Sequence, residues 1–179
     1  MKIFIKNMAG EHLDEIMAIE EASYGEHHWG RESFEGEIKS DIAHYKCALG
    51  ENGQCLGYMG LWKILDEAHI TTIAIHPSAR GRGIAQALII SQIETCLKHK
   101  VKYITLEVRK SNVSAISLYE KFGFKSLGFR KNYYQNNGED ALIMWTENIF
   151  YENFQALYSK NRQALQEKCT VVEAEVQNE

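Results

Sequence analysis

The chain has 179 residues, of which 45% are hydrophobic and 25% charged, and its formal net charge is -4. This length suits one domain of ordinary size, and this composition predicts a packed core and excludes a largely disordered chain. The negative charge argues against broad nucleic-acid binding, which usually accompanies an excess of lysine and arginine.

Four strands and two helices are expected in the first half of the chain. Apolar and polar residues alternate in the expected strands, and an apolar stripe that begins at Leu13 and reaches Glu20 indicates the first helix. The Asn52-Gly53 pair is a strong turn signal and predicts a hairpin between two of the strands. The expected strands cover residues 2–6, 44–49, 56–65 and 68–76, and the expected helices begin at residue 13 and cover residues 31–38.

The second half alternates helices with strands and ends in a different kind of segment. Gly123 follows an expected helix and would end it in the left-handed conformation. The order of elements predicts a mixed α/β sheet in one domain, which we expect over residues 1–148. Residues 149–179 are expected to form an amphipathic helical extension with a ragged tail from Val171, and packing on the sheet, a dimer contact and docking onto a larger partner remain open for it. The expected helices cover residues 83–99 and 112–122, and the expected strands cover residues 103–109, 125–134 and 140–147.

The segment ARGRGIAQALI, residues 79–89, joins the end of an expected strand to the start of an expected helix. The first amides of a helix lack partners and the helix dipole is positive there, so an anion is favoured, and glycine lets that anion approach the backbone. Arg80 and Arg82 add positive charge. The third glycine of the dinucleotide fingerprint and the Gly-Lys-Ser/Thr of nucleotide triphosphatases are both missing. By itself, the segment is compatible with an anion site and with a helix start that binds nothing.

Together with its neighbours, this segment resembles a cofactor-binding motif. Residues 80–85 match the Gln/Arg-x-x-Gly-x-Gly/Ala motif of the GNAT acetyltransferase superfamily, in the strand-loop-helix context that the motif requires. Further on, LEVRKSNVSAISLYEKFGF and YYQNNGEDALIM resemble the N-terminal-acetylating branch, most of all the RimI-type ribosomal-protein-alanine N-acetyltransferases. The resemblance extends from about Ile3 to Asn148. It implies a GNAT-like fold, with a central, mostly antiparallel sheet, a splayed parallel strand pair and flanking helices.

The resemblance also implies acetyl-CoA as the acetyl donor. The turn amides would hold its pyrophosphate, the end of the preceding strand would pair with the pantetheine arm, and Asn112 matches a position that contacts that arm. No metal site is expected, because no spacing pairs His69 or His76 with other ligands. The implied cofactor-binding residues are Ile73, Ala74, Ile75, Arg80, Gly81, Arg82, Gly83, Ile84, Ala85, Asn112 and Tyr119.

Two side chains match the family's positions for acid-base chemistry. Acetyl transfer needs a neutral amine, a stabilised oxyanion and a proton for the leaving thiolate, and an α-amine with a pKa near ~8 loses its proton readily. Glu107 is the candidate base, and the alternative is a carboxylate paired with Arg109 or another cation on a solvated sheet face. Tyr119 is the candidate acid, and the alternative is a core tyrosine, since it lies in an apolar stripe.

Aromatic residues are expected to recognise the acceptor. Tyr133 and Tyr134 match positions that line the peptide groove of N-terminal acetyltransferases, and Glu107 would face the same groove. Trp29 aligns with an aromatic residue of the first helix-loop-helix region, but this chain has HHWG where related enzymes usually have a proline before the tryptophan and a serine after it. His28 is therefore either a second base or a loop histidine without a catalytic role.

These residues predict an acetyl-CoA-dependent N-acetyltransferase that acts on the N-terminal α-amine of a protein, with a ribosomal protein as the first candidate. The alternatives are a small-amine acceptor, such as an amino acid, a polyamine or an aminoglycoside, and an inactive acyl-CoA-binding sensor. We expect a cytoplasmic monomer or dimer without a membrane or direct nucleic-acid partner, because the chain shows neither the apolar run of a signal peptide nor a membrane-spanning stretch. The four cysteines are scattered and are expected to stay reduced.

Overall fold

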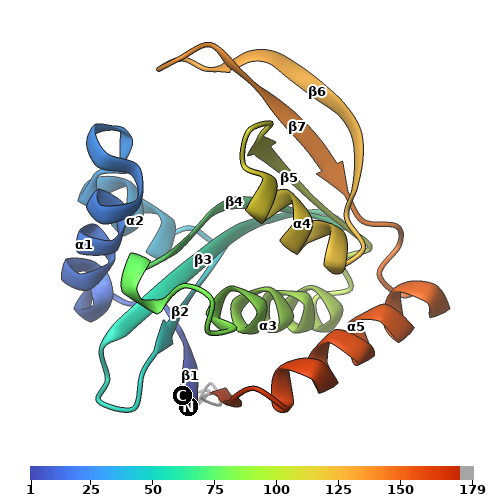
Figure 1. Cartoon of the computed structure of the whole chain (residues 1–179), viewed down its shortest axis with the longest axis horizontal. Helices are drawn as coiled ribbons and strands as arrows, with labels where there is room; N and C mark the ends of the chain where they lie inside the picture. The colour runs from blue at the N-terminus through green and yellow to red at the C-terminus, as the bar shows by residue number, and fades with distance from the viewer. Residues whose placement is uncertain (174–179) are drawn as a thin grey trace.

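One eight-stranded sheet organises the chain in the computed structural model, which describes residues 1–173 (Figure 1). The strand order is β6-β7-β5-β4-β3-β2-β1-β8, and neighbouring strands are antiparallel except for β4 with β5 and β1 with β8. This mostly antiparallel sheet confirms the expected fold class. The strands are β1 (Lys2–Asn7), β2 (Ala43–Leu49), β3 (Cys55–Ile64), β4 (Glu67–Ile75), β5 (Tyr103–Arg109), β6 (Lys125–Tyr134), β7 (Glu139–Trp145) and β8 (Thr170–Glu173).

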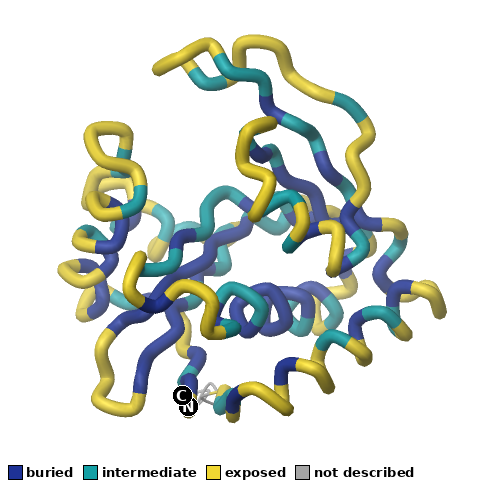
Figure 2. The backbone as a smooth tube through the Cα atoms, in the orientation of Figure 1, coloured by how far each residue is buried: buried dark blue, intermediate teal, exposed yellow. Residues whose placement is uncertain are grey.

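Helices cover both faces of the sheet, and each face has its own apolar core (Figure 1). On one face, α1 and α2 pack around Phe34 and Tyr58, whose rings meet edge to face with centroids 5.3 Å apart. On the other face, α3 lies between the sheet and α5 and is buried on most sides, as the dark tube in Figure 2 shows. The helices are α1 (Leu13–Tyr24), α2 (Arg31–Ile38), α3 (Ile84–Lys98), α4 (Val113–Lys121) and α5 (Glu152–Gln166).

The parallel strands β4 and β5 separate towards their C-terminal ends, as the resemblance implied. Their pairing runs only from Glu67 opposite Tyr103 to Ile70 opposite Leu106, although both strands continue beyond it. A bulge in β4 begins where the pairing ends, because the register with β3 shifts by one residue at Thr71. The divergence leaves a wedge between the two strand ends that β-pairing does not fill.

The C-terminal extension is integrated into the fold. Phe154, Tyr158 and Leu165 of α5 are buried in the same core as α3, so packing is the observed role among those left open by the sequence. The tail expected to be ragged from Val171 instead begins with β8, which pairs in parallel with β1, and this part of the prediction was wrong. Residues 174–179 of that tail lie outside the described residues.

Outside β8, the expected elements are confirmed. Their ends differ from the prediction by at most two residues, except for α5, which covers only Glu152–Gln166 of the helical extension expected from residue 149 to the tail at Val171. Gly123 ends α4 with a φ of 85°, the left-handed conformation expected there. Within residues 1–173, no helix has both the length and the apolar character needed to cross a membrane.

Candidate active site

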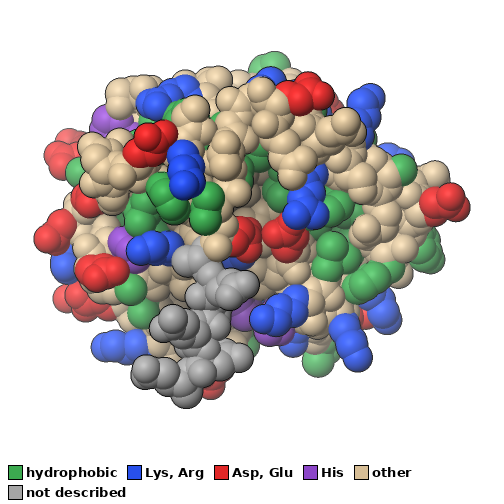
Figure 3. All heavy atoms as spheres, turned by 90° about the horizontal axis from the view of Figure 1, so that it is seen from below, with side chains coloured by type: hydrophobic (Ala, Val, Ile, Leu, Met, Phe, Trp, Pro, Cys, Tyr) green, Lys and Arg blue, Asp and Glu red, His purple; other side chains and the backbone are tan. Residues whose placement is uncertain are grey.

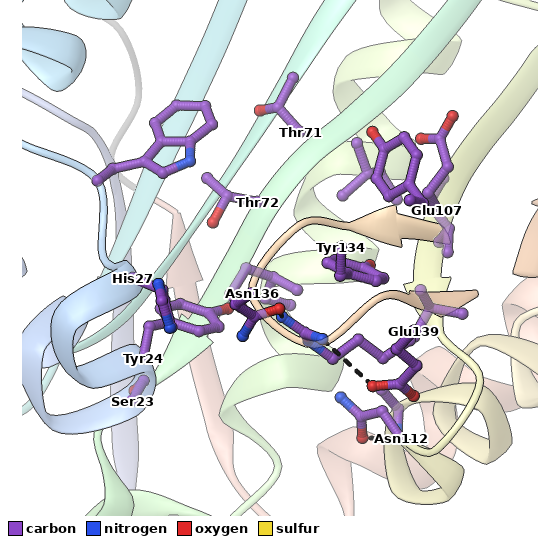
Figure 4. A pocket seen from close by; sticks show the side chains of 18 of the residues that line it. Ser23, Tyr24, His27, Thr71, Thr72, Glu107, Asn112, Tyr134, Asn136 and Glu139 are labelled. Carbon is purple, nitrogen blue, oxygen red and sulfur yellow. Dashed lines mark hydrogen bonds and ion pairs between the residues drawn. The ribbon is translucent and has the colours of Figure 1, made fainter. Parts of the chain in front are cut away.

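Two connected hollows open where β4 and β5 separate. The first, of about 750 Å³, lies between α1, the strand ends and the tip of the β6–β7 hairpin, and we call it the hairpin cleft (Figure 4). The second, of about 500 Å³, follows the end of β4 to the N-terminus of α3, and we call it the turn groove. Tyr24, Ile73, Asn112 and Tyr119 line both hollows, so they form one continuous passage. The lining includes Glu20, Thr72, Glu107, Arg109, Tyr134 and Glu139 in the hairpin cleft, and Ala74, Arg80, Gly81, Gly83, Ala85 and Lys168 in the turn groove.

The turn groove collects the predicted cofactor residues with one exception. Arg82 does not line it, because its guanidinium contacts the sulfur of Met1 at 2.9 Å. Gly81 and Gly83 have φ of 75° and 87°, a left-handed backbone that glycine adopts without strain. The first amides of α3 follow directly and have no partner within the helix. The groove therefore ends at a surface of backbone N–H groups suited to an anion.

The end of β4 is tied to its surroundings by side chains. The hydroxyl of Tyr24 donates to the carbonyl oxygen of Ile73 at 2.8 Å, and burial raises the pKa of Tyr24 to about 12. Nε of Arg80 donates to the carbonyl oxygen of Ile75 at 3.1 Å. Two carbonyls at the free edge of the wedge are thus bound by residues of the passage wall.

Glu107 points from β5 into the hairpin cleft, and its side chain is 9% exposed. Its Oε2 lies 2.6 Å from Nε2 of His69 on β4, and its Oε1 accepts from Nε of Arg130 on β6 at 3.3 Å. The cation partner is therefore Arg130 and not Arg109, the first partner considered from the sequence. The position combines burial with hydrogen-bonding partners from two other strands, β4 and β6, unlike a carboxylate on a solvated face.

Tyr119 is buried like a core tyrosine, and it also lies on the wall of the passage. Its ring is buried against Phe124, with centroids 5.7 Å apart, and the residue also lines both hollows. Burial raises the pKa of its hydroxyl well above the ordinary value, so the hydroxyl keeps its proton at neutral pH. The structure thus brings a protonated phenol to the junction of the two hollows.

The tip of the β6–β7 hairpin is fastened to β5 through Arg109. The guanidinium lies 3.8 Å from the ring centroid of Tyr134, and it donates to Asn136 at 3.1 Å and to the carboxylate of Glu139 at 3.2 Å (Figure 4). Hydrogen bonds from Ser111, with a smaller contribution from Arg109, lower the pKa of Glu139 to about 2. Each of these contacts fixes the tip over the cleft.

The predicted acceptor residues lie on opposite walls of the hairpin cleft. Tyr133 and Tyr134 come from the hairpin and meet edge to face at 5.2 Å, while Trp29 and His27 come from the segment after α1. His28 does not line the cleft, and its Nδ1 lies 2.8 Å from the carbonyl oxygen of Trp29. The hairpin cleft therefore has aromatic side chains on both walls.

Sequence reasoning missed Glu20 as a site residue. It is 1% exposed, yet it lines the cleft, where its carboxylate accepts from the backbone N–H of Trp29 at 2.7 Å and from the hydroxyl of Tyr58. The sequence does contain a signal that could have identified Glu20, because a carboxylate is unusual in the apolar stripe of a helix. In residues 1–173, no group of three or more His, Cys, Asp or Glu side chains is arranged to hold a metal ion.

The chain is similar in sequence and fold to known acetyltransferases. The "Acetyltransferase (GNAT) family" matches residues 13–124. A Bacillus subtilis protein, named provisionally as a ribosomal protein bS18-alanine N-acetyltransferase, is 42% identical over 145 residues, which are 80% of this chain and 95% of that protein. The Escherichia coli K12 ribosomal protein bS18-alanine N-acetyltransferase is 34% identical over 65% of this chain and 78% of its own length. The crystal structure of the ribosomal-protein-S18-alanine N-acetyltransferase from Escherichia coli superposes with a TM-score of 0.75 at 29% identity, covering 84% of this chain and 97% of that chain.

Proposed function

Because this chain belongs to the acetyltransferase (GNAT) family and is an N-acetyltransferase, we propose that it acetylates the N-terminal α-amine of a protein. The family uses acetyl-CoA as the donor. The observation that carries the proposal is the continuous passage, which joins an anion-binding turn to a cleft with aromatic walls on both sides. The names of the Bacillus and Escherichia relatives support the N-terminal alanine of ribosomal protein bS18 as the acceptor.

The turn groove fits the donor. Its glycines and the first amides of α3 would bind the pyrophosphate, and the end of β4 and Asn112 would line the path of the pantetheine arm. Bound there, the donor supplies a thioester whose carbonyl carbon accepts the amine. The passage continues past Tyr119 into the hairpin cleft, so a thioester at the junction would meet an amine that enters between the aromatic walls.

Glu107 would accept a proton from the acceptor amine, and Tyr119 would donate one to the leaving thiolate. The carboxylate of Glu107 accepts one from the α-ammonium, directly or through a water, and the neutral nitrogen attacks the thioester carbonyl. A C–N bond forms, the C–S bond breaks, and the hydroxyl of Tyr119 gives its proton to the leaving thiolate. The nitrogen loses its second proton as the amide forms, and this proton, passed through water, restores the hydroxyl of Tyr119. Burial raises the pKa of Tyr119 and keeps its hydroxyl protonated, and the position of the residue at the junction of the two hollows supports its role as proton donor.

An extended peptide suits the acceptor cleft better than a compact small amine does. Its two walls carry Trp29 on one side and Tyr133 and Tyr134 on the other, and the hairpin wall is held in place by Arg109. Aromatic rings offer large, rigid contact area along an extended chain. The two walls therefore favour a substrate that continues beyond its reacting amine.

Release of free thiol from acetyl-CoA tests the proposal. The purified chain is mixed with peptides that begin with Ala, Met or Ser, with polyamines and aminoglycosides, and with an alanine peptide whose N-terminus is already acetylated. We expect release with the free alanine peptide, the highest rate among the peptides, and no release with the blocked one. If only the small amines cause thiol release, the acceptor is a small amine and not a peptide. If the chain binds CoA but no amine causes thiol release, it is an inactive acyl-CoA-binding sensor.

A further inference from the structure

We propose that the C-terminal extension forms one wall of the donor site, and that Lys168 binds a phosphate group of acetyl-CoA. The inference rests on the proposed donor groove and adds a residue to it. The family match ends at residue 124, so the extension lies outside the segment that the family defines. Lys168 nevertheless lines the turn groove together with Gly81, Gly83 and Ala85.

The extension is held firmly at the place where this wall is needed. The hydroxyl of Tyr158 donates to Glu94 on α3 at 2.7 Å, which fixes the middle of α5. Beyond α5, the backbone N–H of Thr170 donates to the carbonyl oxygen of Met1 at 3.0 Å, and β8 continues along β1. Lys168 is therefore carried between two anchored elements and not on a free tail.

The end of the extension touches the glycine turn itself. A Cβ added at Gly83 would lie 2.9 Å from Cδ1 of Leu165 and 3.8 Å from Sγ of Cys169. In the sequence, Lys168 lies between Leu165 and Cys169, the two residues that face Gly83. Its backbone is thus close to the turn that would hold the pyrophosphate.

The charges of the groove favour a phosphate ligand. Of the described residues that line it, Arg80 and Lys168 alone are charged, and both are positive. Arg80 is engaged with the carbonyl oxygen of Ile75 and the hydroxyl of Ser23, and Arg82 points away to Met1. Elsewhere on the surface, as in the view of Figure 3, cationic and acidic side chains are interspersed. The turn groove therefore differs from that surface, because its described lining residues include cations and no carboxylate. Of its two cations, Arg80 belongs to the family motif and Lys168 does not.

Calorimetric titration of the full chain with CoA and with 3′-dephospho-CoA tests this role. We expect Lys168→Gln to weaken CoA binding about tenfold, the effect of losing one charge-assisted hydrogen bond, and Lys168→Arg to retain most of the affinity. Lys160→Gln is the matched control, since Lys160 is an exposed lysine of α5 that does not line the groove. Its affinity and the melting temperatures of all variants should match the unchanged chain.

The two ligands distinguish the phosphates. An equal loss for both assigns Lys168 to the pyrophosphate, and a loss for CoA alone assigns it to the 3′-phosphate. Unchanged affinity of Lys168→Gln for both ligands overturns the inference and leaves the donor groove standing. If the unchanged chain itself fails to bind CoA, the proposed donor site fails, and this inference fails with it.

A second, independent contact assigns a positioning role to His69. Its Nε2 lies 2.6 Å from Oε2 of Glu107, a separation that requires a proton between the two atoms. With that proton on His69, the imidazole donates to an ionised carboxylate and holds it beside the cleft, while Nδ1 needs no proton. We infer that His69 orients the proposed base.

A double-mutant cycle on kcat tests this second role. We expect His69→Ala to lower kcat about tenfold without changing the KM for acetyl-CoA, and His69→Gln, which keeps an N–H donor, to retain most of the rate. In a Glu107→Gln background, His69→Ala should have no further effect. Additive losses in the cycle, or full activity of His69→Ala, would refute the role, whereas full activity of Glu107→Gln alone would refute the proposed base. His99→Ala, an exposed histidine at the end of α3, is the control.

Discussion

Both carboxylate oxygens of Glu107 have partners on other strands of the sheet. His69 and Arg130 reach it from β4 and β6, two strands that are not neighbours in the sheet. A carboxylate offers about four lone-pair sites, so two donors orient it and leave room for the proton of an amine. At the scale of single residues, the sheet thus orients the proposed base.

Replacing Glu107 by Gln should separate chemistry from donor binding. We expect kcat to fall by about 10²–10³-fold, because general base catalysis contributes roughly that much. The affinity for acetyl-CoA should stay the same, since Glu107 lines the hairpin cleft and not the turn groove. Steady-state thiol release and calorimetric titration measure the two effects. An unchanged kcat would mean that another base, or solvent, removes the proton.

Tyr119→Phe removes one hydroxyl from a buried ring. The ring keeps its packing against Phe124, so we expect the free energy of unfolding to change by less than about 1 kcal/mol. The kcat should fall at least about tenfold, because the thiolate loses its proton donor. Urea unfolding and thiol release check the two statements. Equal turnover in the two proteins would leave Tyr119 with a packing role alone.

At the scale of elements, the β6–β7 hairpin should loosen in acid. The folded pKa of Glu139 is about 2 against an ordinary 4.5, so its stabilising contribution is fully present above pH 4.5 and is lost as the pH falls towards 2. Amide hydrogen exchange of the hairpin tip across this range should show the loss of protection. In Glu139→Gln the tip should lack this pH dependence. A tip equally protected at both ends of the range would contradict the assignment.

The glycine turn and α5 form a second element-scale pair. In Gly83→Ala, an alanine must adopt a φ of 87° and its Cβ must push against Leu165. We expect a loss of about 1–3 kcal/mol from backbone strain and a further loss from this contact. Gly81→Ala is the matched control, because its φ is 75° and no atom lies within 4 Å of the added Cβ. Chemical denaturation of both variants gives their free energies of unfolding, and the difference between the two losses is the cost of the contact with Leu165. Equal losses would show that the side chain of Leu165 moves aside without cost.

At the scale of the whole molecule, we propose that residues 1–148 form the acetyltransferase domain and that the extension completes its core. Phe154 and Leu165 are each 2% exposed, and burial of such side chains contributes about 1.5–3 kcal/mol apiece. A chain ending at Asn148 should therefore melt at least about 10 °C lower, measured by circular dichroism. An unchanged melting temperature would make the extension an independent appendage.

Much of this molecule could be predicted from local sequence, and the exceptions have a common physical cause. The helix over Arg31–Ile38 and the strand over Tyr103–Arg109 were predicted to the residue, since their apolar periodicity is local. The strand β8 was missed because its pairing partner among the described residues, β1, lies at the other end of the chain. The direction of Arg82 was also missed, since positive charge beside a glycine turn does not determine where a flexible side chain points.

The pairing of β8 with β1 also sets an order of events during synthesis. Among the described strands, β1 leaves the ribosome first and β8 last, so one edge of β1 stays unpaired until the other described strands have been made. Folding can begin with the N-terminal elements, as is common for a growing chain. The wall that carries Lys168 can be docked only afterwards. Each copy of the enzyme would therefore complete its proposed donor site only after the residues of β8 have been made.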